Sequence, residues 1–195
     1  MSPVARSALV IPSSYASQEV ATFIAHLDDL LKRQHDQTRK LSTTDLEWQP
    51  APGMNTIGML MAHQAIIEVG WTGAGIEDLQ LDQVSFKEIL GIGSKDDGMP
   101  LPEDGAPPAA LAGKDLAFYD DLLTRAREHL KRVAASVKDS DLTTIRPRPR
   151  PNGEPRELEV RWMIHFMVGH FAGHFGQILL LQHARQAMRA EAKRS

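Results

Sequence analysis

The chain contains no cysteine among its 195 residues. That absence excludes disulfide bonds, cysteine-type zinc sites and a cysteine nucleophile. The net charge of −3 gives no basic excess of the kind that binding to nucleic acid or an anionic membrane would favour. Residues 1–17 carry only a short, broken apolar run, and no apolar stretch approaches about 18 residues without polar groups. We therefore expect a cytoplasmic protein that binds neither nucleic acid nor membrane.

Apolar residues recur at helical spacing in four segments, and the length suffices for one sizeable core. The pattern predicts helices over about 17–41, 55–74, 113–138 and 159–190. Ser17 is the expected cap of the first helix, and Asn55 or Thr56 that of the second. No segment reads convincingly as a strand. The sequence therefore predicts an all-α four-helix bundle, a single domain over 1–195 with its core at about 17–190.

The connections are uneven. Residues 75–112 form a long, loop-rich connection, with one possible short helix at 82–90 and a Gly/Pro/Asp-rich surface loop over 91–109. Two prolines and a glycine argue against helix over 42–55, although Leu46 and Trp48 can fold back onto the core. Around Asn152-Gly153 the chain forms either a small hairpin or a loop. The arginines there alternate with prolines and lack interleaved aromatic residues, which favours a solvated loop over a nucleic-acid site.

Three histidines organise the functional interpretation. His170 and His174 are one helical turn apart on a core-facing stripe, so both rings can reach one metal ion. His63 lies in the middle of the apolar face of the second predicted helix. Three neutral imidazoles that leave other coordination positions of the ion open are typical of a catalytic metal site. The non-functional alternative is a cluster of histidines that hydrogen-bond one another. The HExxH signature is not present, because Phe171 follows His170.

Other polar residues near these positions have weaker patterns. His165 is about 140° around the helix from His170 and should not reach the same ion. Glu68 also points away from His63, so no carboxylate ligand is obvious. Gln177 either contacts a ligand or substrate from one turn beyond His174 or faces solvent. The remaining histidines are expected at the surface or on the flanks of the helices: His26, His35, His129 and His183.

The fourth predicted helix is apolar on more than one side, which indicates burial on more than one side. Either the other helices and the 75–112 connection cover its second arc, or a homodimer does, and we favour a homodimer. Glycines on a third side would allow close packing of another helix. The second arc comprises Ile164, Val168, Phe171, Phe175 and Leu179, and the glycines are Gly169, Gly173 and Gly176.

Two motifs resemble those of the DinB/YfiT-like superfamily of metal-binding four-helix bundles. LEWQPAPGMNTIGMLMAH is similar to that family's Trp-x-Pro-x-Pro-Gly-x-Asn-Ser/Thr-Ile segment, with its first ligand at His63. HFAGHFGQI is similar to its His-x-x-x-His-x-Gly-Gln-Ile motif, with ligands His170 and His174. The resemblance covers roughly residues 17–185. It departs at Phe175, where Arg or Lys is usual, and at Gly169 and Phe171, which replace acidic residues.

The resemblance implies one divalent metal, zinc or nickel most often, held by three histidines and water, and it also implies a dimer. Relatives include thiol-dependent S-transferases and a maleylpyruvate isomerase. We expect a metal-dependent S-transferase that joins a low-molecular-weight thiol to a small electrophile; a metal-dependent hydrolase and a non-catalytic metal-containing binding protein are the alternatives. Candidate substrate-binding residues are Trp48, Asn55, Trp71, Phe166, Met167 and Gln177, the apolar ones of which could equally be core.

Overall fold

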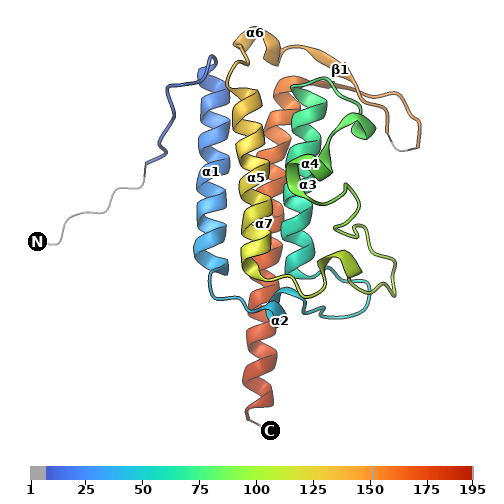
Figure 1. Cartoon of the computed structure of the whole chain (residues 1–195). Coiled ribbons are helices and arrows are strands. Elements are labelled where there is room, and N and C mark those ends of the chain that lie inside the picture. The colour runs from blue at the N-terminus through green and yellow to red at the C-terminus, as the bar shows by residue number, and fades with distance from the viewer. Residues whose placement is uncertain (1–7, 151, 195) are drawn as a thin grey trace, which may run out of the picture.

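Four long helices lie side by side in the computed structural model, which describes residues 8–150 and 152–194 (Figure 1). They are α1 (Gln18–Thr38), α3 (Ile57–Gly75), α5 (Leu116–Ala134) and α7 (Val160–Ala192). Helix α3 packs against α5 and α7, and α1 packs against α7 and α5. The predicted all-α four-helix bundle is confirmed.

Short elements fill the connections: α2 (Thr43–Leu46), η1 (Leu81–Gln83), α4 (Phe86–Leu90), η2 (Ala109–Leu111) and α6 (Asp139–Leu142). The expectation of no helix over 42–55 was wrong at α2, because the prolines act only downstream while Ser42 and Asp45 form a capping box at its start. The short helix expected at 82–90 is present as η1 and α4. Helix α5 is shorter than the predicted 113–138, because Asp115 caps it and α6 follows its end.

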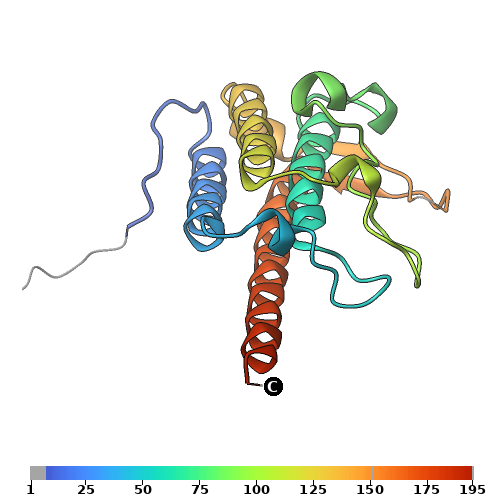
Figure 2. The same ribbon diagram turned by 60° about the horizontal axis from the view of Figure 1, so that its bottom comes forward.

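The segment around Asn152-Gly153 is a hairpin. Its strands β1 (Ile145–Pro147) and β2 (Glu157–Glu159) pair antiparallel. Arg146 and Arg148 both bind the carboxylate of Asp78, and Arg148 also donates to the carbonyl of Ala74 near the end of α3. These arginines therefore anchor the hairpin to the bundle. The hairpin and the 91–108 connection lie on the α3 side, away from α1 (Figures 1 and 2).

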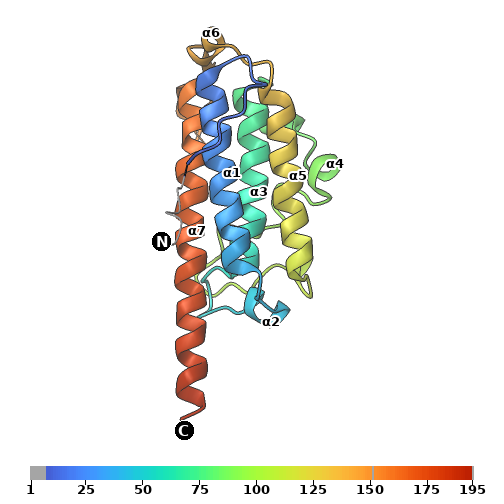
Figure 3. The same ribbon diagram turned by 90° about the vertical axis from the view of Figure 1, so that its left-hand side faces the viewer.

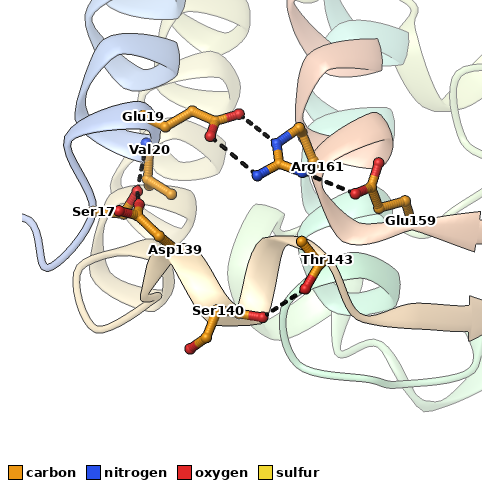
Figure 4. Close-up of polar contacts among 8 residues, drawn as sticks. All are labelled: Ser17, Glu19, Val20, Asp139, Ser140, Thr143, Glu159 and Arg161. Atoms are coloured by element: carbon orange, nitrogen blue, oxygen red, sulfur yellow. Dashed lines mark hydrogen bonds and ion pairs between the residues drawn. The ribbon is translucent and has the colours of Figure 1, made fainter.

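Side chains close the end of the bundle where α1 begins and α7 begins (Figure 4). Ser17 accepts a hydrogen bond from the Val20 amide and donates to Asp139 of α6. Arg161 at the start of α7 donates to Glu19 of α1 over 2.7 Å. The cap expected at Ser17 is thus confirmed, and Thr56 rather than Asn55 caps α3, accepting from the Met59 amide at 3.1 Å.

Helix α7 is the longest element, and its last turns extend beyond the other helices (Figures 1 and 3). Among the described helices it alone is long and apolar enough to cross a membrane by length and composition. It packs along one side on α3 and α1. Most of its second apolar arc is covered by the chain itself, since Ile164, Phe171 and Phe175 are buried and Val168 and Leu179 are half-buried, so that arc is weak support for a dimer.

A different side of α7, not the second apolar arc, stays exposed to solvent. It carries the glycines together with the exposed Trp162 and Leu180. A Cβ atom built on any of the three glycines would meet no described atom within 4 Å. We call this surface the α7 outer face: Trp162, Gly169, Gly173, Gly176 and Leu180.

Candidate metal centre

The three histidines singled out in the sequence converge between α3 and α7. His63 lies in the middle of α3, and His170 and His174 occupy successive turns of α7. Nε2 of His170 is 3.3 Å from Nε2 of His63 and 3.0 Å from Nε2 of His174. One ligand nitrogen from each ring lies within 4.8 Å of the others. Packing of two helices thus joins residues that are about a hundred positions apart in sequence.

These separations fit a shared ion. Two imidazole nitrogens, each about 2.1 Å from one metal, are about 3.0–3.4 Å apart when the bonds meet at ordinary coordination angles. The described residues offer no fourth histidine or carboxylate in this group. The His63 side chain is 17% exposed, so the site reaches solvent. The donor set is therefore that of an open three-histidine site, which could hold a divalent metal.

Hydrogen bonds at the far side of two rings fix which nitrogen faces the centre. Nδ1 of His63 lies 2.7 Å from Oδ2 of Asp97, and Nδ1 of His174 lies 2.7 Å from Oε1 of Gln177. Both oxygens accept, so each Nδ1 carries the proton and each Nε2 keeps its lone pair for the centre. Such outer partners orient metal-binding imidazoles and raise their basicity. The Gln177 contact to His174 is one of the two roles that its spacing allowed.

The electrostatics keep the rings of His170 and His174 neutral. Burial, with a further contribution from the neighbouring rings of His174 and His63, lowers the pKa of His170 to about 3. Burial also lowers the pKa of His174, against the opposing effect of its hydrogen bond to Gln177. At neutral pH these two imidazoles present lone pairs, and a metal could bind them without displacing protons.

Asp97 is the functional residue that the sequence interpretation missed. The 91–109 segment was expected to be a surface loop, yet Asp97 is only 3% exposed and Ile92 is buried. Its second carboxylate oxygen accepts from the Met99 amide, which holds the loop in place. Asp97 is one of two adjacent aspartates in a Gly/Pro-rich stretch with no helical or strand period, so no pattern marked it.

A buried amide pair sets the register of the ligand-bearing helices. Gln34 of α1 and Gln64 of α3 exchange hydrogen bonds of 2.9 and 3.0 Å, and Gln64 also donates to the carbonyl of Phe171 in α7. Gln64 is next to His63, and Phe171 is next to His170. The bond across α3 and α7 therefore acts directly beside two of the three rings.

The other charged and imidazole side chains lie away from the centre. The buried Glu68 accepts two hydrogen bonds from the guanidinium of Arg127, over 2.7 and 2.9 Å. It therefore points away from His63, as the sequence predicted. His165 is exposed and contacts the ring of Phe23 instead. His129 was wrongly expected at the surface: it is 7% exposed, because the α5 turn that carries it packs beside the end of α3.

The six candidate substrate-binding residues divide by position. Phe166 contacts the His170 ring at 5.4 Å between centroids, and Trp71 contacts Phe166 at 5.0 Å. Trp162, which sequence reasoning did not select, stacks on Phe166 at 5.4 Å. These three rings form an aromatic wall on the side of the centre toward the start of α7.

The remaining candidates lie elsewhere. Met167 is buried and, with His170, lines a small crevice between α3 and α7. Asn55 and Gln177 line a cavity beside the centre. Trp48 is half-buried beneath the guanidinium of Arg185, 5.3 Å from its ring centroid. The structure therefore groups Trp71 and Phe166 on one side of the histidines and the two amides on the other.

Comparison with known proteins agrees with the arrangement of the helices. A sequence profile of the DinB superfamily matches residues 21–178. The chain belongs to the DinB superfamily. A solved structure of a conserved protein from Enterococcus faecalis is similar to this DinB chain, with a TM-score of 0.58 at 14% identity. The match covers 82% of this chain and 92% of that one, and it supports the fold alone. No curated protein matches the sequence.

Proposed function

We propose that this DinB protein is a metal-dependent enzyme that joins a low-molecular-weight thiol to a small electrophile. The observation that carries the proposal is the convergence of three imidazole nitrogens, from His63, His170 and His174, at a position open to solvent. Zinc and nickel suit such an imidazole set. Bound there, the ion would favour the thiolate form of a thiol and polarise an electrophile.

The chain's own residues support this chemistry by position. Asp97 and Gln177 hold two of the rings with Nε2 toward the centre. The aromatic wall of Trp71, Trp162 and Phe166 excludes water from one side of the site. Because the chain has no cysteine, the sulfur must come with the second substrate. In transfer to an alkyl chloride, a carbon–sulfur bond forms, chloride leaves and the thiol proton passes to solvent.

Two other functions use the same residues. A metal-dependent hydrolase would use the open site to activate water instead of a thiol. A non-catalytic binding protein would use the metal for structure alone. In structural sites, protein ligands typically fill every coordination position of the ion. The exposed Gln177 and the partly exposed His63 favour an open, reactive site over a closed one.

The decisive experiment measures turnover of monochlorobimane with bacillithiol, mycothiol and glutathione, with zinc, nickel or manganese added. We expect metal-dependent turnover that is lost in His170→Ala and on chelation. The matched control is His183→Ala, which removes an exposed histidine from the same helix. If no thiol gives metal-dependent turnover above the His170→Ala variant, the transferase proposal fails, and ester and amide panels then test the hydrolase.

We also propose that the protein is a homodimer through the α7 outer face. Between Arg161 and Arg185 the helix has no aspartate, glutamate, lysine or arginine, although one side of it stays uncovered. Glycines there leave room for a second helix to approach closely. A helix face of this kind can pack on its own copy about a twofold axis, so that the same face of each subunit forms the interface.

A further inference from the structure

A cavity of about 340 Å³ lies beside the metal centre, between the start of α3 and the second half of α7. This volume falls at the lower end of the range of about 300–1,000 Å³ that is usual for small-molecule sites. No side chain that lines it is charged. The lining residues are Gly53, Met54, Asn55, Leu60, Gln177, Leu180 and Leu181.

The cavity adjoins the centre through Gln177. The same side chain that accepts from Nδ1 of His174 at 2.7 Å also lines the cavity. On the facing helix, Leu60 precedes His63 by three residues, about one turn. The cavity is therefore on the side of the histidines toward the end of α7, opposite the aromatic wall.

The walls are apolar and partly open. Leu180 is 68% exposed and Met54 is 47% exposed, so apolar surface faces water until something covers it. The only polar side chains in the lining are the amides of Asn55 and Gln177. Amides can hydrogen-bond a carbonyl or hydroxyl group but cannot neutralise a charge, and an unpaired charge in apolar surroundings is costly.

We infer that the cavity binds the apolar tail of an uncharged substrate, whose carbonyl-like head group lies between the amides and the metal centre. The inference rests on the proposed function and specifies its substrate class. The electrophile carries a neutral head group on a compact aliphatic tail. Charged groups of a thiol co-substrate remain outside this cavity.

The first test needs no metal and no turnover. Ligand-observed NMR on the metal-free full chain measures binding of straight-chain amides from acetamide to octanamide. Affinity should rise about threefold to fourfold for each buried methylene and level off when the cavity is full. Hexanoate should bind at least about tenfold more weakly than hexanamide, because its carboxylate finds no partner.

Variants locate the binding. Met54→Glu places a carboxylate on the cavity wall at an exposed position outside the α7 outer face and should abolish the gain with chain length. Leu180→Glu should do the same, and because Leu180 also belongs to the outer face, its oligomeric state is measured alongside. Met188→Glu is the matched control, since Met188 is 50% exposed on the same helix but does not line the cavity. Equal chain-length gains in Leu180→Glu, Met54→Glu and Met188→Glu would overturn the inference, as would affinity that does not depend on chain length.

A second measurement separates this inference from the proposed function. Alkyl hydroxamates carry a metal-binding head on the same tails, and the visible spectrum of the cobalt-loaded protein reports contact with the ion. A spectral shift with acetohydroxamate but no gain for longer tails would overturn the cavity inference and leave the metal site intact. Amide binding with the expected chain-length dependence, but no effect of hydroxamates on cobalt, would support the cavity and contradict the metal chemistry.

Discussion

Nδ1 of His63 donates a 2.7 Å hydrogen bond to Asp97, a carboxylate brought in by the loop that follows α4. The contact joins the helix that carries one metal-binding candidate to a connection with no regular structure. Because the carboxylate can only accept, it fixes the imidazole tautomer that leaves Nε2 free. It also gives the 91–108 connection a role in the site.

Removal of the Asp97 carboxylate should weaken metal binding. We expect Asp97→Ala to lower the affinity for zinc by about 10- to 100-fold, the usual effect of losing an outer partner of a ligating histidine, and Asp97→Asn to lower it less. Isothermal titration with a competing chelator measures it. Asp96→Asn is the control, because Asp96 bonds the Gly93 amide in the same loop. Equal affinities in Asp97→Ala and wild type would contradict the assigned role.

The amide pair between α1 and α3 should behave as one unit. Gln64→Leu leaves Gln34 buried without its partner, and an unsatisfied buried amide costs about 1–3 kcal/mol. We expect each single leucine variant to lose that much unfolding free energy in urea, and the double variant to lose clearly less than the sum. Additive losses would show that the two amides are not coupled.

Stability should fall in mild acid, in part because of His129. Burial lowers the pKa of this imidazole, to which Arg132 donates at Nδ1 over 2.7 Å and which faces Glu77 through Nε2. The folded protein therefore binds fewer protons than the unfolded chain, and the free energy of unfolding decreases as pH falls below about 6.5.

The variant His129→Gln isolates this effect. Urea unfolding in chelator from pH 8 to pH 5 should show a shallower decrease for the variant than for wild type. The three histidines of the candidate metal centre contribute equally to both proteins, so the difference belongs to His129. Parallel curves would contradict the assignment.

The proposed dimer can be tested at a glycine. Gly176→Arg adds a charged side chain to the α7 outer face, where the single chain has room for it, and arginine is a better helix former than glycine. We expect sedimentation to show a dimer for wild type and a monomer for Gly176→Arg. Ala117→Arg, on the exposed side of α5, should remain dimeric. Wild type that is monomeric at micromolar concentration would contradict the proposal.

The helices and the three histidines could be predicted because their residues recur at the spacing of an α-helix. Apolar spacing gave the four long helices, and the one-turn spacing of His170 and His174 placed them on one face. The position of His63 on the inward side of another helix was enough to bring it to the same place. The family resemblance gave the same three residues.

Long-range contacts could not be predicted in this way. Asp97 reaches His63 from a loop without periodicity, and the bond between Gln64 and Phe171 depends on the helix register. Which apolar arc of α7 the chain itself covers depends on where α1 and α3 lie, so the sequence left open whether other helices or a second subunit cover the arc through Phe171.

The central claim is that three histidines hold one divalent ion, and metal content measures it directly. Purified wild type, dialysed after loading with zinc or nickel, should retain about one ion per chain by mass spectrometry, and the triple alanine variant of His63, His170 and His174 should retain none. The control is a triple alanine variant of the exposed His26, His165 and His183, which should match wild type. Unchanged metal content in the variant of His63, His170 and His174 would contradict the account.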